Sequence, residues 1–115
     1  MRWDIRLTGE DTTVAGEVDG ALPGQVTLAQ NFPNPFNGGT TISFDLPRPG
    51  TVALTVFNIL GQPVRKLVQV QMVAGHHKVV WDGRNDRGRS LGSGVFFYRL
   101  VGDGQVQIRR LLLLK

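Results

Sequence analysis

The sequence predicts an all-β fold, a sandwich of about seven antiparallel strands. Short segments in which apolar and polar residues alternate recur along the chain, and a two-residue period is typical of half-buried strands. Turn-forming residues separate these segments by about eight to twelve residues, which is the spacing of sandwich strands. No segment shows a sustained helical period, and 15 glycines and 6 prolines favour many turns over long helices.

The first strand is expected to follow a loop rich in proline and asparagine, residues 28–37. Proline lacks a backbone N–H and biases the preceding residue toward extended conformations, so this stretch favours an ordered loop. Its two aromatic residues, Phe32 and Phe36, are expected to plug an apolar surface at a sheet edge, and a ligand-binding loop is the alternative. Residues 41–46 then alternate and predict the first strand.

The later strands are separated by recognisable turns. A turn is expected at residues 47–50, and a second at residues 58–61, where Gly61 can adopt positive φ without penalty. Asp103-Gly104 is the strongest hairpin signal in the chain, and residues 83–94 form a polar loop. The strands themselves are expected over residues 52–57, 64–68, 76–81, 95–101 and 106–114.

The charges divide the chain into an acidic leader and a basic body. Residues 1–20 hold two Lys or Arg against five Asp or Glu, a net charge of −3, whereas residues 21–115 hold eleven against four, a net charge of +7. We therefore expect residues 1–20 to be a linker or the remnant of a preceding domain, and residues 21–115 to be one domain. The basic residues are spread along the body, which favours a solvated surface over a nucleic-acid or glycolipid site.

No targeting or membrane-spanning segment is expected. Residues 1–6 include Asp4 and lead into no apolar core, unlike a signal peptide. No apolar run approaches the roughly 20 residues that a transmembrane helix needs. The chain is therefore either cytosolic or a fragment whose export signal lies further upstream. The absence of cysteine excludes disulfides and thiolate zinc sites.

Three local patterns resemble catalytic or metal-binding motifs, but each lacks a feature that its motif requires. The G-x-S-x-G string at residues 88–92 matches a nucleophile elbow, but an elbow leads into a helix and needs a later histidine. His76 and His77 are adjacent on a strand and point to opposite faces, so a shared metal is disfavoured. Residues 82–88 resemble a calcium loop but lack its ligands, and Asx turns explain their aspartates better. We expect no catalytic residue, no cofactor and no metal site.

Carbohydrate chemistry is also poorly supported. No glutamate follows Glu17, so the body lacks an obvious carboxylate pair for glycoside hydrolysis. Trp81 lies in an alternating segment and is expected in the core, where it could not serve as a platform for sugars.

The order of these motifs resembles the C-terminal sorting domain of proteins exported by the type IX (Por) secretion system. That family is similar to the immunoglobulin-like domain of the flagellar hook-cap protein, and the resemblance covers residues 21–115. Two departures are Gly38-Gly39, where the family usually has a proline, and Arg109-Arg110, where lysines are more usual. The matching pieces are residues 28–37, 40–46, 56–64, 74–83, 93–100 and 109–115.

The resemblance implies an immunoglobulin-like β-sandwich that directs a protein to its destination rather than catalysing a reaction. Such a domain follows an N-terminal cargo domain, an enzyme or adhesin, that passes through the periplasm and is presented to an outer-membrane translocon. It further implies that a surface sortase cuts within residues 1–20 and joins the cargo to anionic lipopolysaccharide, which gives a secreted or cell-surface location. Recognition by the translocon or sortase is assigned to Gly94, Arg109, Arg110, Leu111, Leu112, Leu113, Leu114 and Lys115.

Two other functions stay open: a hook-cap-like assembly or adhesion module, and a carbohydrate-binding accessory module of a secreted glycoside hydrolase. The leucine run at residues 111–114 bears on this choice. On a strand it places two side chains on each face, so one pair should enter the core and the other be covered or exposed. An exposed pair fits a surface kept for a receptor, which could pair with it as an added strand, whereas a strand buried on both faces is the structural alternative.

Overall fold

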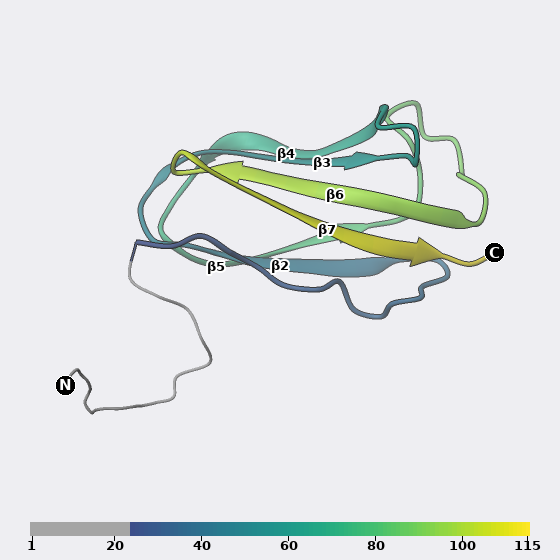
Figure 1. Cartoon of the computed structure of the whole chain (residues 1–115), viewed down its shortest axis with the longest axis horizontal. Coiled ribbons are helices and arrows are strands. Elements are labelled where there is room, and N and C mark those ends of the chain that lie inside the picture. The colour runs from purple at the N-terminus through teal and green to yellow at the C-terminus, as the bar shows by residue number, and fades with distance from the viewer. Residues whose placement is uncertain (1–23) are drawn as a thin grey trace.

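The computed structural model describes residues 24–115, which form two antiparallel sheets packed face to face (Figure 1). One sheet has the strand order β1-β2-β5 and the other β4-β3-β6-β7. The predicted all-β, immunoglobulin-like sandwich of seven strands is thus confirmed, whereas the acidic leader at residues 1–20 lies outside the described residues. The strands are β1 (Thr27–Leu28), β2 (Thr40–Leu46), β3 (Gly50–Phe57), β4 (Pro63–Met72), β5 (Gly75–Trp81), β6 (Gly94–Gly102) and β7 (Gln105–Leu113).

The core lies between the sheets and is filled from alternate positions of the strands. Trp81 at the end of β5 is fully buried, as predicted, and its ring centroid lies 5.6 Å from those of both Phe36 and Phe96. Its indole N–H donates to the carbonyl of Arg84 at 2.9 Å, which satisfies the one polar group of the ring. The full core set is Val26, Leu28, Phe36, Ile42, Phe44, Leu46, Val52, Leu54, Val56, Trp81, Phe96, Tyr98, Leu100, Leu111 and Leu113.

Two of the predicted turns connect neighbouring strands of the four-stranded sheet, and the one after β2 leads from the three-stranded sheet into β3. Between β3 and β4, Gly61 has φ of 80° and its N–H donates to the carbonyl of Asn58 at 2.9 Å. Between β6 and β7, Asp103 and Gly104 have φ of 50° and 69°, the double positive φ of the turn that suits a right-twisted hairpin. No described residue belongs to a helix of the length and hydropathy that crossing a bilayer requires.

Strand β4 is longer than predicted and runs to Met72 rather than stopping at Val68. The register shifts between the β4 partners of Leu54 and Thr55, so that Leu54 pairs with Val68 and Thr55 with Lys66. Such a bulge breaks the two-residue period, and β4 is also an edge strand without one fully buried face. Both features weaken the sequence signal on which the prediction relied.

Candidate recognition surface at the C-terminal strand

The residues assigned to recognition meet at one edge of the four-stranded sheet. Gly94 opens β6 and pairs with Leu113 near the end of β7, so the structure brings the most distant member of the set beside the others. Figure 1 shows β7 running along this edge to the C-terminus. Among residues 24–115, β7 pairs within its sheet with β6 alone and is therefore an edge strand.

The leucine run divides between the core and the surface. Leu111 and Leu113 are each 1% exposed and belong to the core, which confirms that one pair enters it. Leu112 points to the opposite face and is half-buried, whereas Leu114 follows the strand and is 47% exposed. The run is therefore neither buried on both faces nor an open apolar edge.

The proline- and asparagine-rich loop, residues 28–37, covers the outer edge of β7. The N–H of Phe36 donates to the carbonyl of Leu112 at 3.0 Å, and the N–H of Leu114 donates to the carbonyl of Phe36 at 2.9 Å. The side-chain oxygen of Asn34 accepts from the N–H of Leu112 at 3.0 Å. The backbone groups of Leu112 and Leu114 that this edge strand would otherwise offer to another strand are thus already paired.

The two aromatic residues of this loop have different environments. Phe36 is 2% exposed and packs on Trp81, as expected of a plug. The expectation was wrong for Phe32, which is 79% exposed. Its backbone exchanges two 2.9 Å hydrogen bonds with Thr41 of β2, and this pairing fixes the strand-like direction that turns its ring away from the core.

Side chains of β7 complete the closure of the edge against the segment that contains β1. Gln105 accepts from the N–H of Val26, and Gln107 accepts from the N–H of Leu28, both at 2.9 Å. Arg109 donates through Nε to the carbonyl of Leu28 at 2.5 Å. These three side chains occupy alternate positions of one face, where they take the place of hydrogen bonds from a neighbouring strand. Sequence reasoning missed the two glutamines, although polar residues at inward positions beside buried leucines were the available signal.

Tyr98, a core residue of β6, holds the start of the proline- and asparagine-rich loop in place. Its hydroxyl donates to the carbonyl of Ala29 and accepts from the N–H of Asn31, each at 2.8 Å. The side chain of Asn31, itself 2% exposed, donates to the hydroxyl of Thr40 at 3.0 Å. Burial raises the pKa of Tyr98, while the hydrogen bond from Asn31 and the charge of Arg109 act in the opposite direction. The loop is therefore held at both of its ends.

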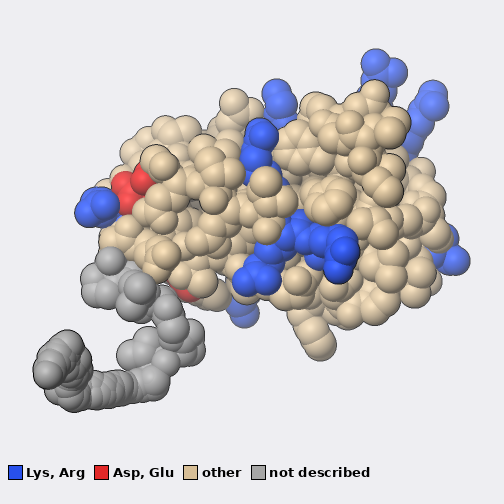
Figure 2. Space-filling model, viewed as in Figure 1, with Lys and Arg blue, Asp and Glu red and all other residues tan. Residues whose placement is uncertain are grey.

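Three side chains of the set remain available to a partner, and we call Arg110, Leu112 and Leu114 the recognition strip. Arg110 points outward on β7 and is exposed, and it lines a groove together with Asn34, Pro35, Val95, Leu111 and Leu112. Lys115 lies beside the strip but is held, because its N–H donates to the Ser93 hydroxyl at 2.8 Å and its ammonium contacts the Ser90 hydroxyl. Figure 2 shows basic side chains gathered over the middle of the face along which β7 runs.

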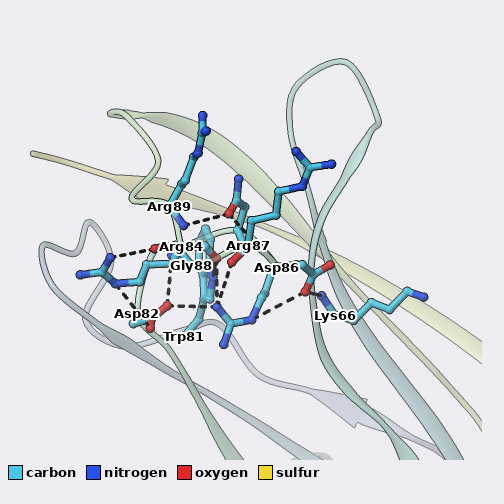
Figure 3. Close-up of polar contacts among 10 residues, drawn as sticks. Lys66, Trp81, Asp82, Arg84, Asp86, Arg87, Gly88 and Arg89 are labelled. Atoms are coloured by element: carbon cyan, nitrogen blue, oxygen red, sulfur yellow. Dashed lines mark hydrogen bonds and ion pairs between the residues drawn. The ribbon is translucent and has the colours of Figure 1, made fainter.

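The loop after β5, which resembles a calcium loop in sequence, is held by its own polar contacts (Figure 3). Asp82 accepts from the N–H of Arg84 at 3.1 Å, the Asx turn that was expected. The same expectation was wrong for Asp86, whose carboxylate reaches across to accept from the N–H of Lys66 on β4 at 3.0 Å. The guanidinium of Arg65 lies 3.4 Å from Asp82 and 3.9 Å from Asp86, and that of Arg84 lies 3.9 Å from Asp82, so two cations face the two carboxylates.

The residues considered for catalysis and metal binding lie apart from one another. His76 contacts Asp45 at 2.7 Å, whereas His77 contacts the carbonyl of Val73 at 2.8 Å from the other face of β5. Ser90 lies in a loop that leads into strand β6 rather than into a helix. Within residues 24–115, no three or more His, Asp or Glu side chains come together in a group that could hold a metal ion.

Comparisons with known proteins agree with this architecture. Residues 29–104 match the family described as FlgD Ig-like domain. Latent dimeric PorU from Porphyromonas gingivalis has a TM-score of 0.62 at 19% identity over 87% of this chain and 10% of that chain. Truncated FlgD from Helicobacter pylori has a TM-score of 0.51 at 17% identity, over 77% of this chain and 70% of that chain. PorZ, a surface component of the type IX secretion system of Porphyromonas gingivalis, has a TM-score of 0.49 at 21% identity, over 78% and 11%.

No curated protein matches the chain in sequence. The chain spans about a tenth of the length of PorU and a larger share of the truncated FlgD. At these identities the likeness to PorU and to truncated FlgD establishes the fold that the chain shares with them.

Proposed function

Because the chain belongs to the FlgD Ig-like domain family, we propose that it is a non-catalytic C-terminal sorting module of that fold. In this proposal residues 21–115 direct an N-terminal cargo through the periplasm and across the outer membrane by type IX secretion. The outer-membrane translocon and a surface sortase are the partners, and residues 1–20 are the linker in which the sortase cuts. Attachment of the cargo to anionic lipopolysaccharide would follow at the cell surface.

One observation carries the proposal: the first and last pieces of the sorting-domain pattern, residues 28–37 and 109–115, form a single hydrogen-bonded unit. Asn34 and Leu112, 78 residues apart in the sequence, are joined at 3.0 Å, and the backbone of Phe36 pairs on both sides of Leu113. Motifs that are far apart in the sequence can act together when they form one surface of the folded domain. Here residues 28–37 hold residues 112–114 in a fixed geometry.

The recognition strip is the part of this unit that a translocon or sortase could contact. Burial of Leu111 and Leu113 fixes the strand, so that Arg110 and Leu112 project from the opposite face. A cation beside an apolar side chain gives a partner both an electrostatic and a hydrophobic contact, the combination found at protein interfaces. The proposal therefore assigns recognition to exposed side chains, with the buried leucines as their support.

The hook-cap-like assembly module is the second candidate, and the family match favours it over the carbohydrate-binding module. A sugar-binding face needs a row of aromatic rings in solvent. Trp81 and Tyr98 are both 0% exposed, and among the large hydrophobic side chains that are exposed in residues 24–115 the one aromatic ring is that of Phe32. The two leading candidates differ in their partner, because an assembly module would bind subunits of its own structure and would need no secretion machinery.

The test is a fusion of residues 21–115 behind a signal peptide and a folded reporter, in a host with type IX secretion. Removing residues 111–115 would trap the reporter in the periplasm, but it would also remove two core leucines and unfold the domain. A sharper variant combines Arg110→Gln, Leu112→Ser and Leu114→Ser, which leaves Leu111 and Leu113 in the core. The matched control is Val106→Ser with Ile108→Ser, two side chains that are 58% and 60% exposed on the same strand.

We expect the strip variant to accumulate in the periplasm as a folded protein and the control to reach the surface. Periplasmic trapping of both would mean that strand stability, not the strip, was changed. Surface delivery of the strip variant at the wild-type level would refute the assignment. Delivery of every fusion in a strain without the translocon would refute type IX sorting itself.

A further inference from the structure

The turn between β3 and β4 presents two large aliphatic side chains at one end of the sandwich. Ile59 is 72% exposed and Leu60 is 78% exposed, and both lie in the turn of residues 58–61, which we call the hairpin tip. Single exposed aliphatic side chains are common on proteins, but an adjacent pair on a projecting turn marks a contact surface.

The hairpin tip is rigid. The side-chain oxygen of Asn58 accepts from the N–H groups of Leu60 and Gln62, each at 3.0 Å. The backbone of Asn58 also donates to the carbonyl of Gln62 at 2.9 Å. A turn already fixed by these bonds loses little conformational entropy when its side chains are bound.

Basic side chains surround the hairpin tip. The N–H of Asp86 donates to the carbonyl of Val64 at 2.9 Å, so the loop after β5 lies against the first residues of β4. Figure 3 shows Arg87 and Arg89 extending from this loop away from its polar cluster. In Figure 2, Lys and Arg side chains project from the end of the molecule where Figure 1 places this turn and loop, and no acidic side chain is visible there.

The acidic residues of this end are already balanced. Both Asp82 and Asp86 lie within 4 Å of Arg65, at 3.4 and 3.9 Å, and Asp82 also lies 3.9 Å from Arg84, so two cations face the two carboxylates. The positive field of Arg87 and Arg89 is therefore not cancelled by these carboxylates. An anionic partner is the electrostatic complement of this surface.

An apolar groove continues from the hairpin tip onto the outer face of the four-stranded sheet. It is lined by Phe57, Gly61, Phe97, Arg99 and Ile108. The guanidinium carbon of Arg99 lies 4.7 Å from the centroid of the Phe57 ring, a cation–π contact that keeps a positive charge over apolar surface. The combination of cations and exposed hydrocarbon thus extends beyond the turn.

We propose that this end of the sandwich docks onto an anionic lipid bilayer. Ile59 and Leu60 insert between the headgroups, and Arg87 and Arg89 bind the lipid phosphates. Membrane affinity of this kind grows with buried apolar area and with attraction to anionic lipid. A bilayer is favoured over a protein partner because projecting aliphatic side chains enter a fluid interface without needing a complementary pocket. This inference does not depend on the secretion route.

The experiment measures binding of the full chain to vesicles by cosedimentation, with phosphatidylcholine alone compared with an equimolar mixture of phosphatidylcholine and phosphatidylglycerol. The first variant, Ile59→Ser with Leu60→Ser, removes the inserting pair. Its control, Val73→Ser with Val106→Ser, removes side chains that are 70% and 58% exposed at the opposite end of the sheet.

The second variant, Arg87→Gln with Arg89→Gln, removes two charges, and its control removes two charges elsewhere, Arg48→Gln with Lys78→Gln. The backbone hydrogen bonds of Arg87 and Arg89 to Asn85 do not involve their guanidinium groups, so the variant should keep the fold. Unchanged melting temperatures confirm that every variant remains folded.

We expect binding to the mixed vesicles only, with the partition coefficient reduced at least about tenfold by either tip variant and little by either control. Absence of binding to mixed vesicles would overturn the proposal. It would equally fail if the Ile59/Leu60 variant bound like wild type, because the exposed pair would then contribute nothing to membrane affinity. Equal losses from both charge variants would show general electrostatic attraction and would also reject a site at this end.

Discussion

Replacing Tyr98 by phenylalanine should destabilise the domain, although no cavity is created. The phenyl ring fits the same buried space, and only the hydroxyl is lost. That hydroxyl serves two backbone groups of the loop over β7, the carbonyl of Ala29 and the N–H of Asn31, both at 2.8 Å. The substitution therefore isolates the contribution of this anchor from that of core packing.

The expected loss in the free energy of unfolding is about 2 to 4 kcal/mol. A buried donor left without a partner costs about 1 to 3 kcal/mol, and Asn31 is only 2% exposed, so water cannot readily replace the hydroxyl. Ala29 is half-buried, and loss of the bond to its carbonyl adds about 1 kcal/mol, the net value of an ordinary hydrogen bond.

Urea denaturation of Tyr98→Phe checks this value, and the midpoint should fall by about 1 to 2 M with an unchanged slope. The control is Thr51→Val, which removes the 3.1 Å contact between the exposed side chains of Thr51 and Gln71 and should cost under about 0.5 kcal/mol. Amide exchange at Asn31 should also become faster in Tyr98→Phe alone. If both variants lose the same small amount, the tyrosine does not anchor the loop.

Three further predictions concern the core, the pH dependence and the loop after β5. Trp81→Ala should cost about 3 to 5 kcal/mol, because the ring is fully buried; a loss under about 1 kcal/mol in chemical denaturation would contradict that burial. Because burial raises the pKa of Tyr98 above its ordinary 10.0, the unfolded chain ionises first. The stabilisation that results from this pKa difference is present below pH 10.0 and is lost as the pH rises through the pKa of the folded state. The melting temperature of Tyr98→Phe should not show this loss at alkaline pH. Ser90→Ala should have the same melting temperature as the wild type, and calcium should not change the melting temperature of either protein. A strong rise in melting temperature on addition of calcium would reveal a binding site.

Strands with one regular buried face could be predicted from the sequence, and those without it could not. In β2 and β3, one face of each strand carries a large apolar residue at every second position from Ile42 to Leu46 and from Val52 to Val56, and these residues reach the core, so the two-residue period was sufficient. In β4 the register shift between Lys66 and Val68 interrupts that period. The two-residue strand β1 is too short to show any period.

The candidate site could be located from the sequence but not resolved into its parts. Four identical leucines carry no information about which pair faces inward, and the choice is made by pairing of Leu111 with Phe96 and Leu113 with Gly94 on β6. The closure of the edge by Gln105, Gln107 and Asn34 depends on contacts between residues about 80 positions apart. Only the folded chain brings such groups together.

Because the loop already pairs with the edge of β7, it determines which groups of this strand a partner can contact. Addition of a strand to β7 would first have to displace the loop, breaking the hydrogen bonds of Asn34 and Phe36 to residues 112–114 and exposing Phe36, which is 2% exposed. Three hydrogen bonds at about 1 kcal/mol each and a phenyl group at about 2 kcal/mol give roughly 5 kcal/mol. That cost would weaken binding by about three to four orders of magnitude. Recognition through Arg110, Leu112 and Leu114 on the intact edge requires no such opening, and a partner of the folded domain should therefore contact the recognition strip.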